Sequence, residues 1–169
     1  PKPSPIVRLF SFLIDKDQVK VTIDNGTSQY EIKNSSSKEF NLNSIKKPSA
    51  PNFEDATDKL TDVPLIKVAY GRSGDKGNKA NIGIIARDPK FYPAICNFLD
   101  EKVVKDCFSN FLEGSVERYF LPGSNSLNFI LNDVLGGGGP ASLRNDPQGK
   151  AYAQILLDQT IPIPAKLID

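Results

Sequence analysis

The sequence predicts an α+β fold, in which a mixed sheet carries about three helices and is preceded by an N-terminal hairpin and a long linker. Short apolar runs of strand length recur along the chain, and two segments of the second half repeat apolar residues at helical spacing. A polar stretch punctuated by proline separates the first hairpin from the rest. We therefore expect a hairpin at 1–32, a linker at 33–63 and the main domain at 64–169.

The N-terminal segments have the pattern of strands. Ile6–Ile14 is strongly apolar, and Gln18–Ile23 alternates apolar with polar residues, which is typical of a half-buried strand. Asn25 and Gly26 form a strong hairpin signal, so Ser28–Ile32 is expected to return as the partner strand.

The linker is predicted from composition, with one short docked piece around Phe40 or Phe53. The sequence starts at Pro1 and contains no methionine, so we expect a fragment of a longer chain.

Order is expected to resume at Pro64. Leu65–Tyr70 is predicted as a short strand, and the apolar run Asn81–Ala86 as a central strand covered on both faces. Val116–Leu121 and Leu127–Leu131 are predicted as two further strands that flank a Pro-Gly-Ser turn.

Three helices are expected between and after these strands. Asp88 caps a helix whose apolar residues run from Phe91 to Leu99, and Glu101–Leu112 repeats the pattern. A third helix should run from Asp146 to about Gln159, followed by an extended edge segment at Ile161–Pro164.

Composition excludes several function classes. The 21 basic and 20 acidic residues balance, so nothing favours a nucleic acid or an acidic membrane surface as partner. The chain has no histidine, so a Ser-His-Asp triad, a Cys-His pair or a His-ligated zinc site cannot be built from it alone. Cys96 and Cys107 are expected as reduced core thiols, and we expect a cytoplasmic or mitochondrial protein without metal or cofactor.

The first glycine-rich segment, residues 71–78, has the sequence GRSGDKGN. Glycine adopts positive φ at no steric cost, so such a loop could turn successive backbone N–H groups toward a phosphate or carboxylate. Arg72 and Lys76 would add positive charge and Ser73 a hydroxyl. The alternative is a tight solvated loop in which Arg72 and Asp75 pair.

The second segment, Gly136–Gly139, places four glycines in a row before Ser142, Arg144 and Lys150. Glycine runs carry an entropic cost, which suggests a backbone that passes close to a ligand, a packed neighbour or a subunit. Arg144 could bind a carboxylate or phosphate with its two-pronged guanidinium. The alternative is a flexible turn before a capped helix.

Glu117 and Arg118 should point to opposite faces of one strand. Burial could raise the pKa of Glu117, although pairing with a cation is the more common role of such a residue.

Several blocks resemble one family. Residues 69–83, AYGRSGDKGNKANIG, resemble the ARSGDKG-x-x-ANIG signature of the acyclic terpene utilisation (AtuA) proteins. Four later blocks resemble its carboxy-terminal domain, namely Gly114–Pro122, Leu127–Phe129, Gly136–Gly139 and Ser142–Lys150. Pro5–Ile14 is similar to the tail of the family's larger amino-terminal domain, so the hairpin would be its remnant. Asn78 stands where the signature often has Asp, which weakens any acid–base role there.

The resemblance implies catabolism of acyclic terpenes and an association with acyl-CoA enzymes, but it assigns no reaction. We expect the domain to bind a small anionic metabolite or a CoA thioester; if it is catalytic, Asp75, Glu117 and Lys76 would move protons. The alternative is a structural module that mediates homo-oligomerisation, with the rest of an AtuA-like chain or an acyl-CoA carboxylase as partner. The predicted ligand-binding residues are Arg72, Ser73, Gly74, Asp75, Lys76, Gly77, Asn78, Asn81, Glu117, Arg118, Gly137, Gly138, Ser142, Arg144 and Lys150.

Overall fold

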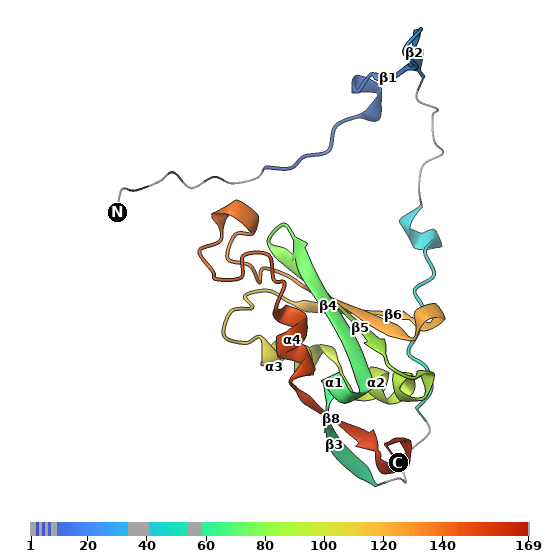
Figure 1. Ribbon diagram of the computed structural model, residues 1–169, viewed down its shortest axis with the longest axis vertical. Helices are drawn as coiled ribbons and strands as arrows, with labels where there is room; N and C mark the ends of the chain where they lie inside the picture. Colours follow the sequence, from blue (N-terminus) through green and yellow to red (C-terminus); the bar gives the residue numbers. More distant parts are fainter. Residues whose placement is uncertain are drawn as a thin grey trace. The chain divides into compact units, whose positions relative to one another are not determined.

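The computed structural model describes residues 3, 5, 7, 10–33, 41–53 and 59–168. The chain divides into two compact units, Phe10–Lys46 and a larger one that contains Lys47–Asp169 (Figure 1). The predicted linker residues 34–40, with Phe40, and 54–58 lie outside the described part. Leu60–Val63 are also predicted as linker, but they belong to a strand of the larger unit.

The smaller unit contains the predicted hairpin. Strands β1 (Val21–Asp24) and β2 (Gln29–Ile32) pair antiparallel, and the side chain of Asn25 accepts hydrogen bonds from the turn. Both strands are exposed within the unit, so the expected half-burial of the first is not observed. No strand forms over residues 10–14, while Ile6, Arg8 and Leu9 of the predicted first strand lie outside the described residues.

The larger unit is built on a four-stranded sheet in the order β4-β5-β7-β6 (Figure 1). Its members are β4 (Ala69–Lys76), β5 (Lys79–Ala86), β6 (Val116–Leu121) and β7 (Ser126–Leu131). The α+β class is confirmed, but every pair in the sheet is antiparallel, so the expected mixture of directions is wrong. Short turns join β4 to β5 and β6 to β7, which explains the direction of two of the three pairs; the third, β5 with β7, joins the two hairpins to each other.

A second, two-stranded sheet pairs β3 (Leu60–Pro64) with β8 (Thr160–Pro164). The extended segment predicted at Ile161–Pro164 is therefore a paired strand. The expected strand at Leu65–Tyr70 is instead a helical turn, α1 (Leu65–Val68), followed by the start of β4. Leu65 and Val68 are buried, and their i, i+3 spacing suits one helical turn better than a strand.

The remaining helices are α2 (Tyr92–Phe98), α3 (Glu101–Cys107) and α4 (Tyr152–Leu157). Asp88 accepts a hydrogen bond from the amide of Lys90 and caps the 3-10 turn Pro89–Phe91 that leads into α2, which confirms the predicted cap. Asp100 caps α3 by accepting from the amide of Val103, a cap that the sequence pattern had not indicated. The third helix begins six residues later than Asp146, because Gly149 has φ +58° and interrupts it. Both cysteines are free thiols as predicted, and burial raises the pKa of Cys96 to about 11.

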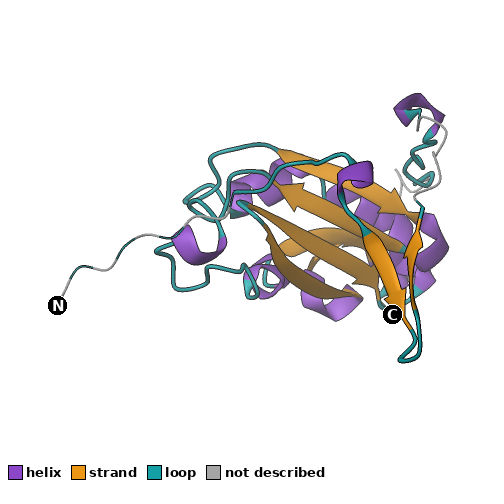
Figure 2. Cartoon of the chain, turned by 90° about the horizontal axis from the view of Figure 1, so that it is seen from above, coloured by secondary structure: helices purple, strands orange, loops and turns teal. Residues whose placement is uncertain are grey.

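The helices cover one face of the four-stranded sheet (Figure 2). Along β5, Ala80, Ile82 and Ile84 are buried while Asn81 and Gly83 are half-buried. The expectation that this strand is covered on both faces is therefore wrong, although it is central. The other face, which we call the open face, is covered by no helix of the described part of the chain.

Phe53 packs edge-on against Phe98 with 5.3 Å between the ring centroids, which confirms one of the two predicted docking points before the domain. The Nζ of Lys47 lies 5.6 Å from the ring centroid of Tyr119.

Candidate functional site

The segment predicted as a glycine-rich loop is a strand. Residues 69–76 pair one by one with 79–86, and only Gly77 and Asn78 form the turn. Within this segment only Gly77 has positive φ, at +69°. An anion nest needs consecutive amides turned toward one point, so the nest interpretation is wrong for these residues.

Strand geometry separates the motif into two sets of side chains, because successive residues point to opposite faces. Arg72, Gly74 and Lys76 belong to the open face with Asn81 of the neighbouring strand. Ser73 and Asp75 point the other way, since their partners across the ladder are the buried Ile82 and Ala80.

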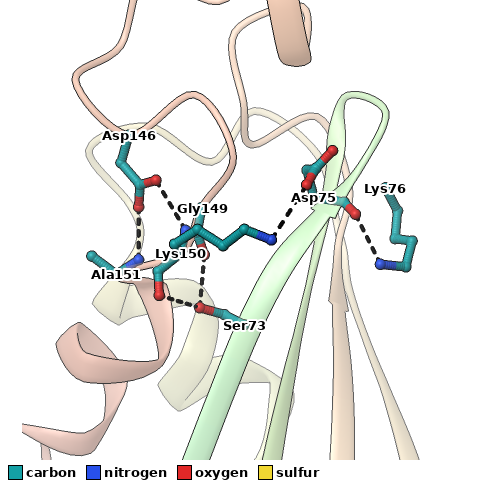
Figure 3. A network of polar contacts seen from close by, with 7 residues as sticks. All are labelled: Ser73, Asp75, Lys76, Asp146, Gly149, Lys150 and Ala151. Atoms are coloured by element: carbon teal, nitrogen blue, oxygen red, sulfur yellow. Dashed lines mark hydrogen bonds and ion pairs between the residues drawn. The ribbon is translucent and has the colours of Figure 1, made fainter.

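Ser73 joins the strand to the segment before α4 (Figure 3). Its buried hydroxyl donates to the carbonyl of Gly149 at 2.7 Å and accepts from the amide of Ala153 at 2.9 Å. The carbonyl of Lys150 lies 3.1 Å from the same hydroxyl. The residue at the N-cap of α4 supplies no side-chain cap, so Ser73 satisfies one of the free amides of that helix from another strand.

Asp146 completes this junction, since its two carboxylate oxygens accept from the amides of Lys150 and Ala151 at 2.9 and 2.8 Å. The result is a fixed backbone at Lys150. From there the Lys150 side chain extends over Gly74 and its Nζ lies 3.7 Å from a carboxylate oxygen of Asp75 (Figure 3).

A shallow pocket of about 310 Å³ follows from this arrangement. We call it the cationic pocket; it is lined by Arg72, Ser73, Gly74, Lys76, Asn81, Gly83 and Lys150. Six of these seven residues were predicted to bind a ligand, and the structure brings them together from β4, β5 and the segment before α4.

The three cations of the cationic pocket differ in how they are engaged. Lys150 faces Asp75, and the Nζ of Lys76 donates to the backbone carbonyl of Asp75 at 2.9 Å. Within the described residues, the exposed Arg72 side chain makes no hydrogen bond, ion pair or ring contact. Its five N–H donors are thus available to an anion.

Asn78 and the glycine run Gly136–Gly139 contact each other beside the cationic pocket and do not line it. The Oδ1 of Asn78 accepts from the amide of Gly137 at 2.7 Å, and its amide group donates to Asp133 at 3.0 Å. A Cβ at Gly138 would lie 2.3 Å from the carbonyl oxygen of Gly77. The two glycine-rich segments are therefore neighbours. The glycine at 138 allows its backbone to lie close to the backbone of the β4–β5 turn, where a side chain would not fit.

Arg144 is directed away from the cationic pocket. Its guanidinium donates to the carbonyls of Val134 at 2.6 Å and Phe111 at 3.0 Å, and it lies over the Phe111 ring. The hydroxyl of Ser142 accepts from the Arg144 amide. These contacts fix the loop after the glycine run and engage both terminal nitrogens of the guanidinium with backbone carbonyls of the domain.

Glu117 and Arg118 do point to opposite faces, as predicted. Glu117 is exposed, and hydrogen bonds from the Tyr119 hydroxyl at 2.5 Å and the Asn132 amide at 2.9 Å lower its carboxyl pKa. A pKa raised by burial is therefore wrong. Arg118 donates to the carbonyls of Cys96 and Leu99 and pairs with Glu101 at 3.2 Å, which ties β6 to the end of α2 and the start of α3.

A second pocket of about 560 Å³ lies beside α4 and is mainly apolar. It is lined by Phe111, Leu143, Arg144, Asn145, Asp146, Ala151, Tyr152 and Ile155. The sequence pattern does not indicate it, because the pocket needs Phe111 from a distant segment and a bend of residues 143–155 that follows from the tertiary structure. Gly83 was also missed, although its place in the period-two pattern of β5 assigns it to the open face.

Two negative findings apply to the described residues alone. They contain no group of three or more Cys, Asp or Glu side chains placed to hold a metal ion. No helix among them is long and apolar enough to span a bilayer.

The comparisons with known proteins agree with this architecture. A family model described as the AtuA ferredoxin-like domain matches residues 63–162, which include both glycine-rich segments and the whole four-stranded sheet. No curated protein and no solved structure matches the chain.

Proposed function

The chain belongs to the AtuA ferredoxin-like domain family, and from that premise we propose that its cationic pocket binds the anionic group of a metabolite, with a CoA thioester as the leading class. The observation that carries the proposal is the free guanidinium of Arg72 beside Lys76 and Lys150. Phosphate and carboxylate oxygens suit a guanidinium because they accept two parallel N–H bonds.

The charge balance of the pocket supports an anion. Arg72, Lys76 and Lys150 line the pocket. Among the described contacts, the only carboxylate that pairs with one of these cations is that of Asp75, which faces Lys150. A phosphate can approach Arg72 without breaking any described contact, while Lys76 and Lys150 strengthen the local positive potential. Because these groups are largely exposed, the attraction should weaken as ionic strength rises.

Replacing Arg72 with alanine is expected to weaken the binding of CoA by about tenfold to hundredfold, since hydrogen bonds to charged groups are the stronger class. Isothermal titration at low ionic strength measures the effect. The fold should be unaffected, because the Arg72 side chain makes no described hydrogen bond, ion pair or ring contact, and alanine leaves the backbone pairing with Gly83 in place.

Two further variants make the comparison sharp. Lys102→Ala removes one positive charge from the exposed surface of α3, on the helical side, and should leave the affinity unchanged. Asp75→Asn removes the negative charge beside Lys150 and should strengthen binding. Equal losses in Arg72→Ala and Lys102→Ala would point to net charge alone and would remove the pocket from the site.

An assembly function is the second candidate, and the apolar pocket beside α4 favours it. Leu143 is 92% exposed and Ile155 37% exposed at this pocket, so a large apolar side chain stands in solvent. Such groups are frequent where a partner binds.

If this surface joins two copies of the chain, Leu143→Asp should shift an oligomer toward monomer at micromolar concentration. Light scattering coupled to size-exclusion chromatography measures the change. A wild-type chain that is monomeric under the same conditions would remove homo-oligomerisation through this surface, whereas the anion site would be unaffected.

A further inference from the structure

Two asparagine amides lie side by side on the open face. The Nδ2 of Asn81 on β5 donates to the Oδ1 of Asn128 on β7 at 3.2 Å. Within the described residues, neither side chain makes another hydrogen bond. The pair therefore retains an unused carbonyl oxygen on Asn81 and unused N–H donors, including both of Asn128.

This inventory does not depend on which way round the amides are placed. If both groups are turned, Asn128 donates to Asn81, and the pair still presents one free carbonyl oxygen and a free NH₂ group. In either arrangement the pair offers a donor and an acceptor next to each other, which is the complement of a secondary amide.

The asparagine pair is continuous with the cationic pocket. In the ladder, Arg72 faces Gly83, and Gly83 faces Asn128 on the next strand. Gly83 has no side chain, and a Cβ built there would approach only the Arg72 carbonyl oxygen, at 3.8 Å. A bare strip of backbone thus separates Arg72 from Asn128, and two strand spacings make it roughly 10 Å long.

We propose that this row selects an anion that carries an amide a few bonds from its charge, as the pantetheine arm of CoA does. The inference rests on the proposed function, because Arg72, Lys76 and Lys150 hold the anionic group. The asparagine pair then binds the amide through one N–H and one C=O. A purely alkyl chain would cover these polar groups without satisfying them, so the site would discriminate against it.

The test compares two phosphate monoesters, 4′-phosphopantetheine and octyl phosphate, which share the anionic group but differ in their amides. Isothermal titration of the wild-type protein should give about tenfold tighter binding of 4′-phosphopantetheine, as expected for one or two neutral hydrogen bonds. The double variant Asn81→Leu/Asn128→Leu should lose this preference and bind octyl phosphate at least as well as the wild type.

Two variants complete the design. Asn128→Asp keeps the shape of the side chain but replaces donors with a charged acceptor, so it should also lose the preference, and it serves if the double variant melts early. Asn110→Ala, at an exposed position on the helical side, should change nothing.

The outcomes separate the two proposals. Equal affinities of the wild type for both esters would overturn the inference about the amide and leave the anion site supported. If neither ester binds, both proposals are overturned.

Discussion

Replacing Gly138 with alanine is expected to destabilise the domain by about 3 kcal/mol, because a left-handed backbone and a steric overlap act together. Gly138 has φ +76°, and an added Cβ would lie 2.3 Å from the carbonyl oxygen of Gly77. That oxygen belongs to the β4–β5 turn and cannot rotate away as a side chain would. Urea denaturation should show a lower midpoint, and the thermal midpoint should fall by roughly 10 °C.

Two glycines of the same chain separate these causes. Gly139 has φ +41° and nothing within 4 Å of an added Cβ, so Gly139→Ala reports the backbone conformation alone. Gly123 has neither restriction, and Gly123→Ala should be nearly neutral. The predicted order of destabilisation is Gly138, then Gly139, then Gly123. A Gly138 variant as stable as the Gly139 variant would show that the close contact between the two segments does not matter.

Replacing Ser73 with alanine should cost about 3 kcal/mol, since buried backbone groups left without partners cost about 1–3 kcal/mol each. The carbonyl of Gly149 and the amide of Ala153 would both lose the hydroxyl. Because the same bonds fix the backbone at Lys150, the affinity for CoA should also fall. Urea denaturation and isothermal titration with CoA therefore test the hydroxyl separately.

Ser124→Ala provides a matched control, because that hydroxyl belongs to an exposed residue and contacts Leu121 and Ser126 only at the β6–β7 turn. It should cost less than about 1 kcal/mol and leave the binding of CoA unchanged. If Ser73→Ala unfolds at the same urea concentration as Ser124→Ala, the proposed junction between β4 and α4 is not what stabilises this part of the fold.

Local signals in the sequence predicted some elements well. The strand Val116–Leu121 was predicted with its observed bounds and Leu127–Leu131 one residue short of β7, because short runs of strand-forming residues flank a Pro-Gly-Ser turn. The helical segment after Asp88 was indicated by its acidic cap and its apolar spacing, and the start of α3 at Glu101 by apolar spacing alone. These features depend on residues only a few positions apart.

The main errors concern the segment that matters most. Residues 71–76 contain two glycines and four polar residues, so intrinsic propensity argues against a strand. Pairing with β5, whose Ile82 and Ile84 are buried in the core, overrides that propensity. The alternation of Arg72, Gly74 and Lys76 with Ser73 and Asp75 becomes meaningful only once the strand is known.

Long-range contacts explain the other differences. Nothing near Ser73 in the sequence indicates that it satisfies an amide of a helix 80 residues away. Arg144 carries a charge that suits an anion, yet two carbonyl groups from distant segments engage it. In both cases the residue type indicates which groups the side chain can bind. The tertiary structure determines which of those groups it meets.

The most direct test of the central claim is the backbone amide spectrum of the ¹⁵N-labelled protein during a titration with CoA. We expect chemical shift changes at Arg72, Gly74, Asn81, Gly83 and Lys150, which saturate together and are absent in Arg72→Ala. Changes confined to the apolar pocket around Leu143 and Ile155, or no changes at millimolar CoA, would contradict an anion site on the open face of the sheet.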